Sequence, residues 1–147
     1  MWPMTARIIS RLRAGSILVA TVGALLFMLQ ASAAQASESL GVWRNPKNSV
    51  HVEIRSCGAK TCGYVVWASE KAKRDAREGG TENLIGLQLF RDFEPRTNGV
   101  LHGRVFVPDL NRTFSGSAKF LDDNTLQAKG CFLGNLLCKT QIWRRVS

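Results

Sequence analysis

The sequence predicts an all-β fold, an eight-stranded antiparallel up-and-down barrel that follows a cleaved signal peptide. Eight apolar or alternating segments succeed one another between residues 39 and 146, nearly all joined by short turns. Residues 100–131 show the pattern best, because apolar and polar side chains alternate there through three segments separated by turns at 108–111 and 122–124. Period-two alternation indicates strands with one dry and one wet face.

Closure of such strands into a barrel is favoured over an open sandwich, because closure removes the unpaired edge strands. The wet face carries Lys, Arg, Ser, Thr and Gln, so it does not suit the lipid side of an outer-membrane barrel. Eight strands enclose just enough space for packed side chains or one small ligand. Small residues on the dry face either leave room for a ligand or let the strands bend, and the pattern leaves both readings open: Gly103, Gly116, Ala118, Ala128 and Gly130.

The elements before residues 100–131 are also predicted from their apolar and polar patterns. Residues 39–44 open the fold around Trp43, and residues 49–56 alternate apolar with polar side chains. Residues 63–67 are apolar on both faces, which predicts a central or doubly covered strand. Residues 70–78 are charged and rich in alanine, and they predict a short solvated helix or a mobile loop without an apolar stripe, packing weakly at best.

Apolar and polar side chains alternate again at residues 84–93, which predicts the fourth strand. The three alternating segments of residues 100–131 predict strands at 100–107, 113–120 and 125–131. Asn98-Gly99 closes the turn before the first of these strands. The last strand covers residues 138–146 and carries Trp143. No internal repeat or low-complexity segment interrupts this order.

Residues 1–36 are predicted to be a secretory signal peptide, with residues 37–147 forming a single domain. Three arginines precede an uncharged apolar run at 17–29, and small-x-small patterns at 34–36 and 31–33 offer cleavage sites, the first preferred. The alternative is a retained membrane anchor, but the run is short for a span of roughly 20 residues. We therefore expect a periplasmic or secreted protein that does not span the membrane after cleavage.

The chain is basic, with 20 Lys and Arg against 11 Asp and Glu, and removal of the leader leaves a net charge of about +6. One basic cluster lies in the charged segment and consists of Lys71, Lys73, Arg74 and Arg77. Another lies near the C-terminus and consists of Lys139, Arg144 and Arg145. Such clusters favour an anionic envelope component as a partner, or simply keep the protein in solution. Export and the lack of exposed aromatic residues argue against nucleic acid.

All four cysteines lie in the mature part, where export favours disulfides. They allow three pairings, of which we favour the local ones, Cys57 with Cys62 and Cys131 with Cys138, because each pair brackets a candidate turn. The alternative is a zinc site or a redox pair, but the spacings differ from the two intervening residues typical of those motifs.

The sequence shows no catalytic constellation, and it predicts no metal site and no cofactor. Neither a nucleophile elbow nor a phosphate-binding glycine loop nor a zinc-protease motif is present. His51 and His102 both fall on predicted wet faces. An enzyme of unknown type therefore stays the third choice.

A series of motifs resembles the secreted bacterial family called domain of unknown function 2147. The matching segments are Gly41-Val42-Trp43, Val52-Glu53-Ile54, Cys57-Gly58, Cys62-Gly63, Gly86-Leu87-Gln88, residues 103–109, Thr125-Leu126, Gly130-Cys131 and residues 141–146. The chain departs from the family at Leu101-His102-Gly103, at Val107-Pro108-Asp109 and at residues 77–81. Residues 77–81 lie in the central loop of the family, so any function that the family draws from this loop is in doubt here.

The resemblance implies a lipocalin-like barrel. Gly41 and Trp43 in the first strand, with Arg144 or Arg145 in the last, are similar to the Gly-x-Trp and arginine pair of lipocalins. That similarity implies a guanidinium on the indole face at the closed end of the barrel. The alternative is that Trp43 is an ordinary core residue and both arginines are solvated.

The leading hypothesis is an exported barrel that holds a small apolar or amphipathic ligand in the cell envelope. The alternative is a cavity-free binding module whose basic loops contact a protein or an anionic envelope polymer. The face of Tyr64 and Val66 is open, because both faces of that strand are apolar. The residues expected to line the barrel interior are Val52, Ile54, Tyr64, Val66, Leu87, Leu101, Val105, Phe114, Ala118 and Leu126.

Overall fold

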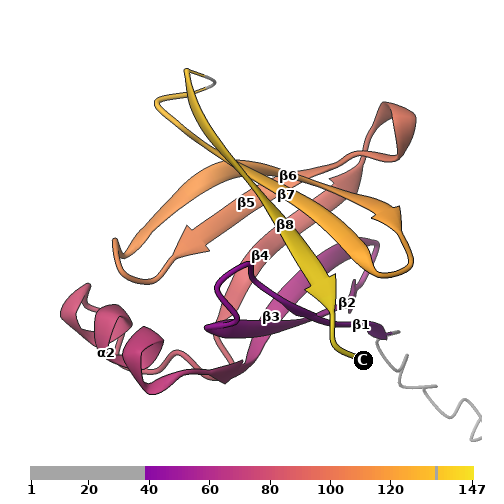
Figure 1. The fold of residues 1–147 in the computed structure, drawn as a ribbon. Helices are drawn as coiled ribbons and strands as arrows, with labels where there is room; N and C mark the ends of the chain where they lie inside the picture. The colour runs from indigo at the N-terminus through magenta and orange to yellow at the C-terminus, as the bar shows by residue number, and fades with distance from the viewer. Residues whose placement is uncertain (1–38, 135) are drawn as a thin grey trace, which may run out of the picture. The chain divides into compact units, whose positions relative to one another are not determined.

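A computed structural model describes residues 39–134 and 136–147 as a closed antiparallel barrel of eight strands in sequence order (Figure 1). The predicted fold is confirmed, whereas the predicted signal peptide lies outside the described residues. The strands are β1 (Ser39–Arg44), β2 (Val50–Cys57), β3 (Lys60–Ala68), β4 (Gln88–Pro95), β5 (Leu101–Val107), β6 (Arg112–Asp122), β7 (Thr125–Phe132) and β8 (Leu137–Arg145). A helix, α2 (Glu70–Glu78), and a single 3-10 turn, η1 (Thr97–Gly99), lie before and after β4.

The fourth strand begins later than residues 84–93 predicted. Residues 84–87 form a turn against β3, in which Gly86 adopts a positive φ of 82° and its N–H donates to the Val65 carbonyl. Asp92 also has a positive φ, and the pairing of β4 with β5 shifts register between Arg91 and Glu94. In the pairing with β3, Gly63 faces Phe90 and Tyr64 faces Gln88, so Leu89 is an extra residue on β4, and Leu89 and Phe90 are both buried against simple alternation.

The charged segment is a helix, and it packs better than the sequence suggested. The Ser69 hydroxyl accepts a hydrogen bond from the Ala72 N–H and caps its N-terminus. Ala72 and Ala76 lie one turn apart on the same face and pack against the barrel core. The lack of large apolar side chains lets the helix approach closely, which an apolar stripe of leucines would not.

The turns divide the barrel into two ends. The β1–β2, β5–β6 and β7–β8 turns and helix α2 lie at one end, here called the open end. The β2–β3, β4–β5 and β6–β7 turns and the C-terminus lie at the other, the closed end (Figure 1). Hydrogen bonds link the rim of the open end, because Ser69 N–H donates to the Ser49 carbonyl and the Thr81 hydroxyl donates to the Pro108 carbonyl.

The closed end is sealed by the first and last strands. The Arg145 guanidinium lies over the Trp43 ring, with its carbon 4.6 Å from the ring centroid, while Arg144 instead donates to the Thr125 hydroxyl. Trp43 is fully buried and also contacts Phe120, with 5.4 Å between ring centroids. Gly41 has a φ of 100°, and any β-carbon there would collide with the Arg145 guanidinium. The Gly-x-Trp motif therefore makes space for the arginine that covers the indole.

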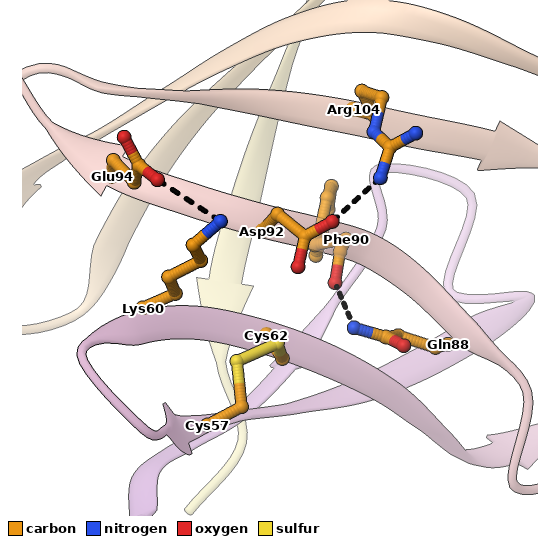
Figure 2. The surroundings of a disulfide bond; sticks show 8 residues. All are labelled: Cys57, Lys60, Cys62, Gln88, Phe90, Asp92, Glu94 and Arg104. Carbon is orange, nitrogen blue, oxygen red and sulfur yellow. Dashed lines mark hydrogen bonds and ion pairs between the residues drawn. A yellow bond between two sulfur atoms is a disulfide. The ribbon is translucent and has the colours of Figure 1, made fainter.

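Both predicted disulfides are present, one at each end of the barrel. Cys57–Cys62 links the β2–β3 hairpin at the closed end, and Cys131–Cys138 joins directly opposed residues of β7 and β8 at the open end. Around the first bridge, the outer surface carries ion pairs between Lys60 and Glu94 and between Arg104 and Asp92 (Figure 2). All four cysteines are thus used in structural bridges.

The assignment of Tyr64 and Val66 to the barrel interior is wrong. Val52 and Ile54 point inward, and they pair with Val65 and Gly63 of β3, so those residues share the inner face. Tyr64 lies on the outer face beneath the Arg55 guanidinium, 4.2 Å from its ring centroid. Val66 is exposed, at a register shift between His51 and Val52.

Candidate functional site

A cavity of about 900 Å³ lies at the open end, between the rim turns, α2 and strands β5, β7 and β8. Its wall is mainly apolar, and its rim is polar and charged. The wall includes Ala72, Ala76, Leu84, Leu89, Phe90, Val105, Phe106, Ala128, Gly130, Phe132, Ile142 and Trp143. The rim includes Asn45, Lys47, Ser49, Lys71, Asp75, Asp109, Lys139 and Gln141. Its size falls within the range of small-molecule sites.

The cavity arises from the unequal lengths of the first and last strands. β1 ends at Arg44, whereas β8 extends from Leu137, and only residues 43 and 44 pair with β8. Opposite the unpaired part of β8, the inner face of β7 carries Ala128 and Gly130. A β-carbon added at Gly130 would meet no atom within 4 Å. Small side chains and a short first strand together leave this end unfilled.

Trp143 contributes to the cavity wall and also carries an unsatisfied hydrogen-bond donor. Its side chain is buried, and among the described residues its indole Nε1 has no hydrogen-bond partner. A buried donor without a partner costs about 1–3 kcal/mol. The Nε1 atom is itself shielded from solvent, so this N–H belongs to the packing beside the cavity and is not exposed to a ligand in it.

Polar side chains follow Trp143 along the inner face of β8. Leu126, Ala128 and Gly130 of β7 pair with Trp143, Gln141 and Lys139, so these three β8 residues share the inner face. At about 3.3 Å per residue, Lys139 lies roughly 13 Å from Trp143 along the strand. Lys71 on the rim is neutralised by Asp75, with 2.6 Å between the charged atoms. Lys139 makes no ion pair with any described residue.

The structure brings only one of the ten expected ligand-contacting residues to this cavity, namely Val105. Four of the others are packed in the core, namely Val52, Ile54, Ala118 and Leu126. Two more, Leu87 and Leu101, pack against the core. Phe114 lines a separate hollow beyond the cavity, and Tyr64 and Val66 lie outside the barrel. Most of the residues expected to contact a ligand inside the barrel thus belong to its packed core, and the cavity lies nearer the open end.

The residues that form the cavity carried a weak signal in the sequence. Ala128 and Gly130 stood among the small residues of the dry face, although nothing in the alternation distinguished them from Gly103 or Gly116. Lys139 and Gln141 alternate with Trp143, which would place them inside once the face of Trp143 is known. The contributions of α2 and the β1–β2 turn had no local signal, because they depend on tertiary packing.

The two basic clusters of the sequence do not form two basic patches. Lys71 and Lys73 pair with Asp75 and Glu70 on α2 itself. Lys139 lies at the open end, whereas Arg144 and Arg145 pair with β1 at the other end of the same strand. The charge of this barrel is thus spread more evenly than the sequence indicated.

Within residues 39–134 and 136–147, no group of three or more His, Cys, Asp or Glu side chains could hold a metal ion. No helix of this part is long and apolar enough to cross a membrane.

Comparisons with known proteins agree with the barrel. The profile of a family described as uncharacterised proteins conserved in bacteria (DUF2147) matches residues 41–145. The solved structure of protein HP1028 from Helicobacter pylori, described as belonging to the lipocalin family, superposes with a TM-score of 0.60 at 15% identity. The match covers 76% of this chain and 85% of HP1028. No curated protein matches the chain.

Proposed function

The chain belongs to the bacterial family DUF2147 and has a lipocalin-like barrel, and from this premise we propose that it is an exported carrier of a small amphipathic molecule. The observation that carries the proposal is the cavity with an apolar wall and Lys139 near its mouth. The leader-like residues 1–36 and the two disulfides support a location outside the cytoplasm.

The ligand's apolar part would lie against Ala128, Phe90 and Val105, where burial of its surface supplies the affinity. An anionic group of the ligand would meet the Lys139 ammonium at the mouth. The rim is already ordered, because the Asn45 side chain accepts hydrogen bonds from the N–H groups of Ser49 and Val50. A preformed mouth lowers the entropic cost of binding.

Filling the cavity tests the proposal. Gly130→Phe adds a ring on the inner face where space is open, and Ser115→Phe adds the same ring on the outer face of β6 as the matched control. We expect decanoate, titrated by calorimetry, to bind wild type and Ser115→Phe equally and Gly130→Phe at least tenfold more weakly. Equal affinity in a folded Gly130→Phe protein would show that the cavity is not the site.

A second experiment tests the positive charge of Lys139 at the mouth of the cavity. Lys139→Glu is expected to weaken decanoate about fivefold and to leave the neutral decanol unchanged, because only the acid interacts with the ammonium. Lys119→Glu, on the exposed outer face of β6, makes the same charge change away from the mouth. If both variants weaken decanoate equally, net charge rather than Lys139 governs the affinity.

A further inference from the structure

Four leucines lie exposed together at the open end. Leu133, Leu136 and Leu137 of the β7–β8 hairpin are 75%, 83% and 61% exposed, and Leu110 of the β5–β6 turn is 50% exposed. Isolated exposed leucines are normal, but a cluster on a monomer marks a contact surface. Leu110, Leu133, Leu136 and Leu137 are called the leucine patch below.

The patch has a defined framework. Leu110 and Leu133 line one hollow with Phe114 and Phe132, whose ring centroids are 4.3 Å apart. Leu137 pairs directly with Phe132, next to the Cys131–Cys138 bridge that fixes the base of the hairpin. The leucines are therefore presented from a covalently closed hairpin that rests on a pair of aromatic rings.

Basic side chains flank the leucines. Arg112 lines the same hollow as Leu110 and Leu133, and Lys139 lies two residues beyond Leu137 on the same face of β8. Asp109 is the one acidic side chain among the described residues that line this hollow. An apolar tip with cations beside it matches a surface whose interior is apolar and whose boundary is anionic.

We propose that the leucine patch inserts into the surface of an anionic lipid bilayer, with Arg112 and Lys139 at headgroup level, and that this places the cavity mouth against the membrane. The β7–β8 hairpin, which carries three of the four leucines, extends beyond the neighbouring strands (Figure 1). Exposed leucines flanked by Arg112 and Lys139 match the apolar interior and the anionic boundary of such a bilayer. The inference does not depend on the ligand proposal.

Vesicle sedimentation tests it, with residues 37–147 as the protein, since the barrel and its core lie within residues 39–147. We expect binding to vesicles of equal phosphatidylglycerol and phosphatidylcholine, and at least tenfold weaker binding to phosphatidylcholine alone. Leu133→Ser with Leu136→Ser should weaken binding at least tenfold. The matched control is Leu121→Ser with Val146→Ser, which removes exposed apolar side chains at the closed end and should leave binding unchanged.

Arg112→Glu, outside the ligand cavity, tests the electrostatic part and is expected to weaken binding to the anionic vesicles several-fold. Equal binding by the two serine double variants would overturn the proposal. A second result would also overturn it. In that result the wild-type protein does not bind vesicles but forms a dimer, detected by sedimentation velocity without vesicles, and the Leu133→Ser with Leu136→Ser variant does not form this dimer. Decanoate binding is measured without vesicles, so failure of the carrier proposal and failure of this one are separable.

Discussion

The two ends of the barrel use the same eight strands in opposite ways. At the closed end Trp43, Phe93 and Leu126 are almost completely buried, and the C-terminal residues hydrogen-bond back to β1. At the open end the strands surround a cavity, and leucines face solvent. The closed end thus supplies stability, and the open end has the features of a binding surface.

Glycines on the inner face show that the packing also changes over short distances. At Gly103 a β-carbon would collide with the Phe93 ring, and at Gly116 it would collide with Val105. Only glycine fits at these two positions, because neighbouring side chains fill the space that a β-carbon would need. Gly130 has the same alternation and the same strand type, yet nothing lies within 4 Å of its added β-carbon. One residue type therefore permits tight packing at Gly103 and Gly116 and leaves open space at Gly130, although Gly116 and Gly130 are direct partners across β6 and β7.

The largest expected effect is the loss of Trp43. Trp43→Ala removes the largest fully buried side chain and the surface on which Arg145 lies, so it should lower the free energy of unfolding by about 3–5 kcal/mol. Gly130→Phe, which enters open space, should change that free energy by less than about 1 kcal/mol. Urea denaturation measures both. Similar losses for the two variants would mean that the ends do not differ in packing.

The two disulfides sharpen the comparison. Removing either bridge, by Cys57→Ser with Cys62→Ser or by Cys131→Ser with Cys138→Ser, should cost about 2 kcal/mol of stability through loop entropy. Only the second pair holds the strands that carry Gly130 and Lys139, so only its removal should also weaken decanoate binding. Denaturation and calorimetry on both proteins check this. Weakened binding in the Cys57 and Cys62 variant would show that the ends are coupled.

Most of the fold could be predicted from the sequence, because strands, turns and local disulfides depend on neighbours within a few residues. Alternation placed eight strands in order, and turn residues located the hairpins. The prediction failed where tertiary geometry decides, as at the bulge around Asp92 and in the choice of face for Tyr64 and Val66. In both places the sequence is apolar or irregular on both faces, so periodicity contains no information on direction.

The candidate site was harder to predict for the same reason. Its volume results from the early end of β1, the approach of α2 through Ala72 and Ala76, and the emptiness beside Gly130. Each of these concerns a distance between segments far apart in the sequence. Lys139 is instructive, because it was grouped with Arg144 and Arg145 by proximity in sequence, whereas the strand carries it to the opposite end of the barrel.

The smallest expected effect concerns the rim and pH. His51 lies beside the β1–β2 turn, where its Nε2 is 2.7 Å from the Asn48 side-chain oxygen and its ring is 4.5 Å from that of Trp67. Partial burial, followed by the nearby charge of Arg44, lowers the His51 pKa below its ordinary value of 6.5. The folded state then binds fewer protons than the unfolded state, so stability is present above pH 6.5 and declines as pH falls through the lowered pKa.

Melting temperatures between pH 7.5 and 5 should therefore decline slightly more steeply in wild type than in His51→Gln. Arg44→Gln should raise the His51 pKa, followed directly by NMR of the ring protons, because it removes the neighbouring positive charge but keeps the packing against Trp67. A wild-type His51 pKa at or above 6.5 would contradict the prediction. Because the ring is mostly solvated, this effect should adjust the rim turn and leave the sealed end, where Arg145 covers Trp43, unchanged.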